Sequence, residues 1–316
     1  MKTSLSDNLT YTEHASDIIA KGAALALAAQ PFVLITSLAI EGGAAREVGS
    51  LALVEQSGAM TGYLSNGCID RDIQNHAQDA LGSKQRKLIR YGDGSRYVDL
   101  KLPCGGALTV LIDPAPDIDA ILNADAQLVA RQPVTLAFQD GETDRPQRFT
   151  YAPRHRLALA GRGAIFRSMA QVGHAMDFDV RLLSPDAEDL AAIGHLSSAT
   201  PIKLTTPSAA PALDMLDAYS AFLTLFHDHD WEPCLLRAAL ETPAHFVGSL
   251  GSRRTHDKRC ETLGQMGVTD ASLARLHGPI GLVPSLRDAS SIAASALAEI
   301  VVAFQDTVAQ FDTVSK

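Results

Sequence analysis

The chain has 316 residues, of which 46% are hydrophobic and 20% are charged. These values exclude wholesale disorder, and the length allows about two domains. Lys and Arg number 27 against 36 Asp and Glu, so the net charge is −9. This excludes a general attraction to nucleic acid, and no long basic run supplies a local one. The four cysteines form no C-x-x-C pair, which weighs against a zinc ribbon, a redox dithiol or a disulfide scaffold.

The N-terminal segment and the apolar stretches give no sign of secretion or of a membrane span. Met1 to Glu13 is polar and lacks the apolar core of a signal peptide. The longest apolar stretch, Gly22 to Ile40, is interrupted by Gln30 and Pro31, which favours a helix followed by a strand. We therefore expect a cytoplasmic protein with reduced thiols that binds no membrane and no nucleic acid.

The first half has the pattern of an α+β domain. Apolar periodicity and turn residues predict a helix, several strands, a second helix and further strands, which is not regular βαβ repetition. Gly82 is expected to cap the second helix at its C-terminus. The expected elements are helices at 14–29 and 70–81 and strands at 32–38, 51–55, 60–64, 88–91 and 108–112.

A polar stretch separates this half from the next. A helix pattern follows Asp117 and runs to about Arg131, and two predicted strands then flank Gln139 to Arg148, which is rich in charge and turn formers. We place the domain boundary after this stretch. Residues 1–152, including a linker at 113–152, are assigned to the N-terminal domain, and residues 153–316 to the C-terminal domain.

The second half alternates regularly between strands and helices, which is typical of a doubly wound parallel sheet, so we predict a Rossmann-like domain. The last helix is apolar on a broad face. We expect this face to close the core, with a homodimer interface as the second interpretation. Strands are expected at 156–160, 179–183, 202–204, 221–225 and 245–248, and helices at 164–174, 186–192, 233–240, 253–266 and 290–311.

The first strand of this half runs into Gly161-Arg162-Gly163 and then into a helix. Gly161 can take a positive φ where the strand ends, and Gly163 lets a phosphate approach the helix N-terminus. Phe166 stands where a dinucleotide-binding fingerprint has a small residue, and Ser184 stands where the ribose-binding acid is expected. Phosphate or nucleotide binding and the loss of ordinary NAD binding therefore both stay open.

A second polar loop, His227-Asp228-His229-Asp230, follows a later strand of the same sheet. Both histidines would share one face of an extended segment and could bind a metal or handle protons. A solvated loop in which Asp230 caps the next helix is favoured over a metal site, because the spacing fixes no third metal ligand.

The third loop, Gly248 to Arg254, brings glycines, a hydroxyl and two arginines to a helix start, which suits an oxyanion such as phosphate. The alternative is that Ser252 caps the helix and the arginines lie on the surface. Because the carboxyl ends of parallel strands meet at one edge of a sheet, three such loops together favour ligand binding.

Two cysteines of the first half lie in glycine-flanked loops. Cys68 precedes a predicted helix N-terminus, where a thiolate is favoured, and Cys104 lies in a turn before a strand. Thiolates are soft metal ligands and react in sulfur chemistry. Cys234 and Cys260 fall within helix patterns and are expected to be structural.

Together these elements resemble the XdhC/CoxI family, whose members are accessory factors in the maturation of molybdenum hydroxylases such as xanthine dehydrogenase. The resemblance extends over about residues 32–114 and 157–302. Asn66 and Asp70 depart from the family's G-G-C-[IL]-E pattern. In the second half Ala164, Ser184 to Asp186 and Val283 to Leu286 also differ. The matching elements are Arg46 with Gly49, Gly67 to Asp70, Cys104 to Gly106, Gly161 with Gly163, His227 with Asp228, Gly248 to Arg254 with Arg259, Gly278 to Leu282 and Leu297 to Ile300.

The resemblance implies a chaperone, rather than a turnover enzyme, that binds the molybdenum cofactor (molybdopterin), assists its terminal sulfuration and delivers it. The implied partners are a molybdenum hydroxylase subunit and a sulfurtransferase such as a cysteine desulfurase. Cys68 and Cys104 are the implied reactive residues. The implied residues that bind the cofactor or its nucleotide are Arg46, Gly67, Gly105, Gly106, Gly161, Gly163, His227, Asp228, Gly251, Ser252, Arg253 and Arg254.

Two other functions remain open. The turn at Gly161 to Gly163 motivates an NAD(P)-dependent oxidoreductase, against which Phe166 and Ser184 argue. The departure at Val283 to Leu286 motivates a regulatory homologue that keeps the fold without the ligand. The metal content is not predicted.

Overall fold

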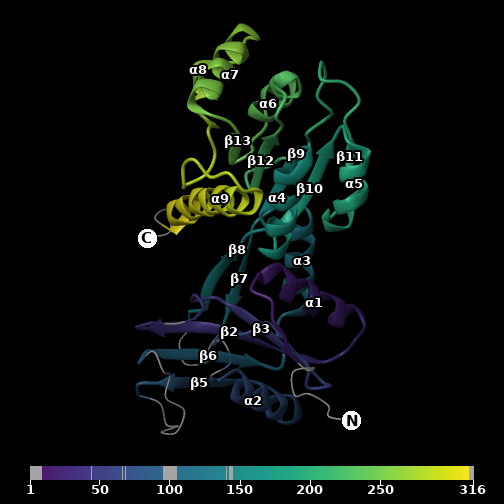
Figure 1. Cartoon of the computed structure of the whole chain (residues 1–316). Coiled ribbons are helices and arrows are strands. Elements are labelled where there is room, and N and C mark those ends of the chain that lie inside the picture. The colour runs from purple at the N-terminus through teal and green to yellow at the C-terminus, as the bar shows by residue number, and fades with distance from the viewer. Residues whose placement is uncertain are drawn as a thin grey trace. The chain divides into compact units, whose positions relative to one another are not determined.

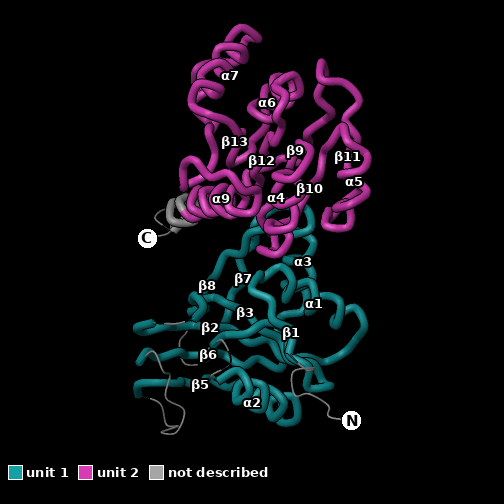
Figure 2. The backbone as a smooth tube through the Cα atoms, viewed as in Figure 1, with its two compact units in different colours: residues 1–153 teal, residues 154–316 magenta. Residues whose placement is uncertain are grey.

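The structure, a computed structural model, describes residues 9–43, 45–65, 67, 69–94, 105–139, 141 and 145–312, with side chains described to residue 305. Cys68 and Cys104, which the sequence singles out, lie outside the described residues. The chain divides into two compact units, residues 1–153 and 154–316 (Figure 2). Each unit has its own six-stranded sheet and its own hydrophobic cores.

The first unit is built on a largely antiparallel sheet in the order β1-β4-β3-β2-β6-β5 (Figure 1). Among the described residues of this unit, only β1 and β4 pair in parallel, and a separate hairpin is formed by β7 and β8. The strands are β1 Leu9–Thr10, β2 Phe32–Glu41, β3 Leu51–Glu55, β4 Met60–Thr61, β5 Lys87–Gly92, β6 Ala107–Asp113, β7 Val134–Phe138 and β8 Gln147–Tyr151, and the helices are α1 Ala15–Leu27, α2 Asp70–Ser83 and α3 Ile118–Val129.

Strand β2 explains why this sheet has a core on each face. Successive side chains of a strand point to opposite faces. Leu34 joins the core formed with α1, α3 and the hairpin, whereas Val33 and Ile35 join the core formed with α2. The mainly apolar run FVLITSL is therefore buried on both sides, and burial of its apolar side chains stabilises the sheet through the hydrophobic effect.

Two expectations for this unit were wrong. The strand expected at 60–64 ends at Thr61 because Gly62 takes a φ of +84°. A Cβ there would lie 2.9 Å from the Leu51 carbonyl oxygen, so the chain turns at a glycine. Gly82 does not cap α2, which continues to Ser83. Lys84 takes the left-handed φ of +55° instead and donates its N–H to the Ala80 carbonyl.

The second unit is a parallel sheet in the order β11-β10-β9-β12-β13-β14 (Figure 1). The chain order reverses between β9 and β12, so the predicted Rossmann-like fold is confirmed. The strands are β9 Arg156–Gly161, β10 Asp179–Ser184, β11 Ile202–Lys203, β12 Ser220–Leu225, β13 Phe246–Ser249 and β14 Leu276–His277. The α-helices are α4 Gly163–Ala175, α5 Ala187–Ile193, α6 Glu232–Leu240, α7 Arg253–Gln265, α8 Asp270–Leu273 and α9 Ala289–Asp312, and the 3₁₀ helices are η1 Gly194–Leu196 and η2 His229–Trp231.

Helices cover both faces of this sheet. Side chains of α4 and α9 form one core with alternate residues of β9, and α6 and α7 cover the other face. Ala293, Leu297, Ile300 and Phe304 of α9 are buried in the first core. The expectation that the last helix closes the Rossmann core is therefore confirmed.

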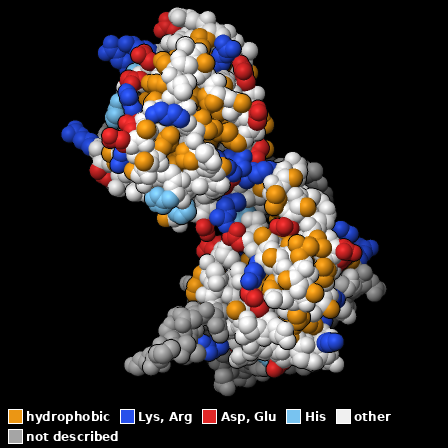
Figure 3. Space-filling view, turned by 90° about the vertical axis from the view of Figure 1, so that its right-hand side faces the viewer, with side chains coloured by type: hydrophobic (Ala, Val, Ile, Leu, Met, Phe, Trp, Pro, Cys, Tyr) orange, Lys and Arg blue, Asp and Glu red, His pale blue; other side chains and the backbone are white. Residues whose placement is uncertain are grey.

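On the side shown in Figure 3, Lys and Arg side chains are interspersed with Asp and Glu on both units. Among the described residues, no helix is both long enough and apolar enough to cross a bilayer.

Candidate functional site

Three polar loops lie at the carboxyl edge of neighbouring strands in the Rossmann unit. Strands β9, β12 and β13 are adjacent and parallel, so the loops that follow them emerge at the same edge. The guanidinium of Arg162 forms an ion pair with Asp228 that links the first two loops. The tertiary structure therefore brings the glycine turn and the His-Asp loop together.

The two positions of the first turn require glycine for different structural reasons. Gly161 is the last residue of β9 and does not take the expected positive φ. A Cβ there would lie 2.7 Å from both the Cβ and the carbonyl oxygen of Leu225 on β12, so a side chain would push the two strands apart. Gly163 does take a positive φ, +79°, and a Cβ there would meet nothing within 4 Å. Gly163 is therefore a glycine because of its backbone conformation and not for lack of room for a side chain.

An internal carboxylate occupies the N-terminus of α4. The backbone N–H of Gly163 donates to Oδ2 of Asp189 at 2.6 Å, and Nε of Arg167 donates to Oδ1. Asp189 is 2% exposed. A carboxylate is stabilised at a helix N-terminus by the same N–H groups and dipole that would stabilise a phosphate. The anion position of the glycine turn is therefore filled by the chain itself.

The acid after β10 is also committed to local structure. Asp186 accepts N–H groups of Glu188 at 2.8 Å and of Asp189 at 3.1 Å as the N-cap of α5, and these hydrogen bonds lower its pKa. Ser184 is fully buried and accepts the Asp186 N–H at 3.0 Å. The side chains of Ser184 and Asp186 are therefore both used in local hydrogen bonds at the start of α5, and neither is positioned for a ribose hydroxyl. Phe166 is buried in the core under α4.

The His-Asp loop differs from the expected extended segment. His229 begins the 3₁₀ helix η2, so His227 and His229 do not alternate along a strand. Asp230 caps no helix, because α6 begins after Trp231 without a side-chain cap. Within the described part of the chain, no group of three or more His, Cys, Asp or Glu side chains is arranged to hold a metal ion.

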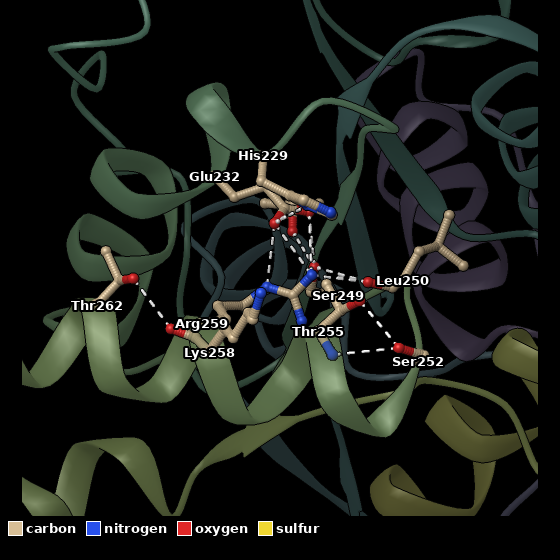
Figure 4. A network of polar contacts seen from close by, with 10 residues as sticks. His229, Glu232, Ser249, Leu250, Ser252, Thr255, Lys258, Arg259 and Thr262 are labelled. Atoms are coloured by element: carbon tan, nitrogen blue, oxygen red, sulfur yellow. Dashed lines mark hydrogen bonds and ion pairs between the residues drawn. The ribbon is translucent and has the colours of Figure 1, made fainter.

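A buried ion pair between α6 and α7 anchors the second and third loops (Figure 4). Arg259 donates from Nε to Oε2 of Glu232 at 3.1 Å, and from Nη2 to Oε2 at 3.0 Å and to Oε1 at 3.2 Å. Their side chains are 3% and 2% exposed. His229 Nδ1 lies 3.1 Å from Glu232 Oε2. A buried pair of this kind is tolerated because each charge is hydrogen-bonded.

The same network continues to the strand ends. Ser249 of β13 donates to Glu232 at 3.0 Å and accepts from Thr224 of β12 at 2.6 Å. Nη2 of Arg259 also donates to the Leu250 carbonyl at 2.7 Å. The loop after β13 is therefore held from inside by a chain of hydrogen bonds, and it leads to Ser252, which caps α7 by accepting the Thr255 N–H. The interpretation of Ser252 as an N-cap is confirmed.

A cavity of about 570 Å³ opens beside this network, between η2–α6 and α7. Its volume is within the range of small-molecule sites. Its lining combines three cations with two carboxylates and several hydroxyl or ring groups. The lining residues are His229, Asp230, Glu232, Pro233, Arg254, Thr255, Lys258, Arg259 and Thr262. Of the expected residues in the third loop, Arg254 lines this cavity, whereas Gly251, Ser252 and Arg253 are not among the described lining residues.

In the first unit, Arg46 is engaged by neighbouring groups. Its Nη2 donates to the Glu13 carbonyl oxygen at 2.5 Å, and its guanidinium lies 5.0 Å from the centre of the Tyr63 ring. Tyr63 donates a hydrogen bond to the Glu13 carboxylate, which raises the pKa of the phenol. Arg46 thus closes a contact between the segment before α1 and the loop after β2.

Asp70 fixes the loop in front of α2. Its carboxylate accepts the N–H groups of Leu64 at 2.8 Å, Ser65 at 3.1 Å and Gly67 at 2.6 Å, and the residue is 2% exposed. Ser65 in turn accepts the Ile69 N–H at 2.9 Å. Gly67 takes a φ of +98°. One buried acid therefore holds the backbone N–H groups of Leu64, Ser65 and Gly67, which precede position 68.

Gly105 and Gly106 stand before β6 for separate reasons. Gly105 has a φ of +68° in open space, whereas a Cβ on Gly106 would lie 2.6 Å from the carbonyl oxygens of Glu41 and Gly43. Gly106 is therefore needed for close backbone packing at this end of the sheet.

Sequence reasoning missed three acids of these sites. Asp189 carries no local signal, because its partner Gly163 lies 26 residues away. Glu232 precedes a proline at a helix start, and only its partner Arg259, 27 residues on, explains its burial. Asp70 stood in a motif, but the pattern did not show that its carboxylate organises the preceding loop.

The fold and these sites define a two-unit protein whose Rossmann-like domain carries a polar cavity at the carboxyl edge of its sheet. The model of the XdhC Rossmann domain matches residues 157–300, and the model of the XdhC and CoxI family matches residues 25–92. The chain belongs to the XdhC/CoxI family.

Relatives with known names extend over both units. The chain is 29% identical over 282 residues to the Molybdenum cofactor insertion chaperone PaoD of Escherichia coli K12, spanning 85% of this chain and 82% of that protein. It is 24% identical over 272 residues to YqeB of the same organism, spanning 86% of this chain and 43% of that protein.

A solved structure has the same fold. A protein of Bacillus halodurans described as a xanthine dehydrogenase superposes with a TM-score of 0.72 at 20% identity, over 91% of this chain and 96% of that one.

Proposed function

We propose that this protein binds the molybdenum cofactor and delivers it to a molybdenum hydroxylase. The observation that carries the proposal is the alignment with the insertion chaperone PaoD, which extends over 85% of this chain and 82% of that protein. Matches to both family models, one in each unit, support it.

The thiols of Cys68 and Cys104 are the proposed contacts to the molybdenum centre or to the sulfur that the cofactor receives. Thiolates suit both tasks because they are soft ligands and sulfur nucleophiles. The sulfur would come from a partner sulfurtransferase. Asp70 supports this role because its three backbone hydrogen bonds hold the loop that leads to position 68.

Ordinary dinucleotide binding is disfavoured. The N–H of Gly163 is already bonded to Asp189, and Asp186 is used as a helix cap. An NAD(P) pyrophosphate would have to displace a buried carboxylate from the α4 N-terminus, which costs its hydrogen bonds.

The test is co-purification of cofactor. The full chain would be expressed in a host that makes molybdenum cofactor and purified without oxygen. Bound pterin would be measured by fluorescence after oxidation, and molybdenum by elemental analysis. We expect near-stoichiometric pterin with the wild type, its loss in Cys68→Ala and Cys104→Ala, and its retention in Cys234→Ala, which removes a thiol within α6.

Two outcomes would contradict the proposal. Wild-type protein without pterin that nevertheless binds a hydroxylase subunit would support a regulatory homologue. Pterin that stays bound in both cysteine variants, with normal sulfuration of the hydroxylase, would exclude the thiol role.

A further inference from the structure

We propose that the cavity between η2–α6 and α7 is a binding site for a phosphate monoester, with Arg254 and Lys258 as its charged contacts. The inference rests on the proposed function and deepens it, since it places the phosphate of the cargo in this cavity and adds Lys258, one turn further along α7 from Arg254, as a charged contact. The same chemistry would also accept the phosphate of a nucleotide.

The charges that line the cavity are unevenly balanced. Glu232 and Arg259 neutralise one another in their buried pair. Arg254 and Lys258 lie one turn apart on α7, both exposed, and both line the cavity. Among the described residues no carboxylate forms an ion pair with either of them, and Asp230 is the remaining acid of the lining. The site therefore has an excess of positive charge that a dianion would offset.

The helix itself adds to this imbalance. A helix N-terminus is normally stabilised by acidic residues, because the dipole is positive there. Helices α5, α6 and α8 each have an acid in the first turn. Helices α4 and α9 have none, but the carboxylates of Asp189 and Asp288 accept a backbone N–H at their starts. Helix α7 has no acid in its first turn and begins with Arg253 and Arg254. Basic residues at this position destabilise a free helix end, and a bound anion would reverse the sign of the effect.

A buried donor without a partner gives independent support. The side chain of Arg259 is 3% exposed. Its Nη1 atom is inaccessible to solvent and has no hydrogen-bond partner among the described atoms. An unmet donor on a buried guanidinium costs free energy. Arg259 lines the cavity, so small movements around an anion held by Arg254 and Lys258 would give this donor an acceptor.

The competing anion position in the same domain is closed. At the α4 N-terminus, Asp189 supplies the negative charge from within the chain. No internal carboxylate is recorded at the α7 N-terminus in the described residues, where Ser252 supplies only a neutral hydroxyl cap. Of the two helix starts, α7 is the one left without an anion.

The test measures phosphate binding by the full chain. Inorganic phosphate and the common ribonucleoside 5′-monophosphates would be titrated by calorimetry and phosphorus NMR. We expect saturable binding that weakens by about tenfold in Arg254→Gln and in Lys258→Gln, since a charge-assisted hydrogen bond is lost. Both residues are exposed, so the variants should fold. Arg237→Gln is the matched control, because Arg237 lies on α6 in an exposed pair with Glu241 and outside the cavity lining.

The source of the phosphate is decided by a second readout. Loss of bound pterin in Arg254→Gln and Lys258→Gln would assign the site to the cofactor's own phosphate. Tight nucleotide binding that these variants lose, with pterin retained, would assign it to a nucleotide. Either result supports the phosphate site.

Failure of this inference is distinct from failure of the proposed function. Equal binding by wild type and both variants, or no saturable binding of phosphate or of any nucleotide, overturns the site, even where wild-type protein carries pterin. Phosphate binding that depends on Arg254 and Lys258 in protein without pterin keeps the site and overturns the chaperone.

Discussion

The carboxylate of Asp189 accepts the backbone N–H of Gly163 at 2.6 Å and so fills the helix start that follows the glycine turn. Asp189→Ala would leave that N–H and the Arg167 guanidinium without their acceptor, and we expect unfolding free energy to fall by about 2 kcal/mol. Sulfate should raise the melting temperature of this variant more than that of the wild type, because an anion can enter the vacated position.

Glu188→Ala is the control for this prediction. Glu188 lies exposed in the same first turn of α5 and has no contact with Gly163. Thermal unfolding with increasing sulfate would compare the three proteins, and an equal response of Asp189→Ala and wild type would show that the α4 N-terminus does not accept an external anion.

The Glu232–Arg259 pair should be strongly coupled. Arg259→Met leaves a buried carboxylate with no counter-charge, and we expect a loss of about 3–5 kcal/mol in urea unfolding. The double variant Glu232→Leu/Arg259→Met should recover most of this loss, since no charge is then buried. His229→Ala, whose side chain is 56% exposed, should cost under about 1 kcal/mol. Additive single effects would show that the two charges do not stabilise one another.

Asp179 should make the Rossmann unit sensitive to acid. Burial raises its pKa, but the charges and hydrogen bonds of Arg156 and Arg181 outweigh this and hold it below the ordinary 3.8. A lowered pKa in the folded state means that the ionised form stabilises folding. This contribution is complete above the ordinary value and is lost as the pH falls through the lower folded value.

The pH prediction is tested with Asp179→Asn. At neutral pH the variant should be less stable than wild type in urea unfolding, and the difference should shrink as the pH is lowered below 3.8. A difference that stays constant with pH would mean that the ionised carboxylate contributes nothing to stability.

The two glycines of the turn should respond differently to substitution. Gly161→Ala introduces a Cβ 2.7 Å from Leu225, and we expect a loss of about 1–3 kcal/mol from displacement of the strands. Gly163→Asn keeps a residue that tolerates a positive φ in open space and should cost less than Gly163→Ala. Chemical unfolding of the three variants gives the order, and equal costs for the two Gly163 variants would exclude backbone strain as the cause.

Asp70→Asn tests the support of the loop before α2. The amide can still accept at one atom, but its NH₂ group cannot accept the N–H of Gly67. We expect a loss of about 1–3 kcal/mol and faster hydrogen exchange at Gly67, whose N–H loses its acceptor. Asp79→Asn, on the same helix with a carboxylate 72% exposed, should leave exchange unchanged. Exchange rates that match the wild type in Asp70→Asn would exclude this positioning role.

Much of the second unit could be predicted from local patterns. From β9 to α7, apolar runs alternate with amphipathic segments, and the expected bounds of the elements agree with the structure to within one or two residues. The reason is that each helix must bury one face, and the spacing of its apolar residues shows which face that is. An N-cap at Ser252 was the alternative to oxyanion binding at the third loop, and the structure has the hydrogen bond of that cap. The two-residue strands β1 and β14 were missed, whereas β11, which is equally short, was predicted from its place in the regular alternation of strands and helices.

The sites were less predictable where two distant residues must meet. Gly161 was expected to be a glycine because of a positive φ, but the close approach of Leu225 on β12 is what excludes a side chain there. His229 was expected in an extended segment, yet it turns into η2 and faces Glu232. Both outcomes depend on which strand lies next to which, and that information is not local.

Local spacing alone was enough to establish a Rossmann-like half and the loops that carry its polar residues, because burial of alternate side chains is decided within each element. The tertiary structure decided which charge satisfies which helix start. Asp189 reaches Gly163 because β10 lies beside β9, and Glu232 reaches Arg259 because β12 lies beside β13. Electrostatic pairing acts through space over a few ångströms, so these partners are set by the packing of the elements and not by their separation along the chain.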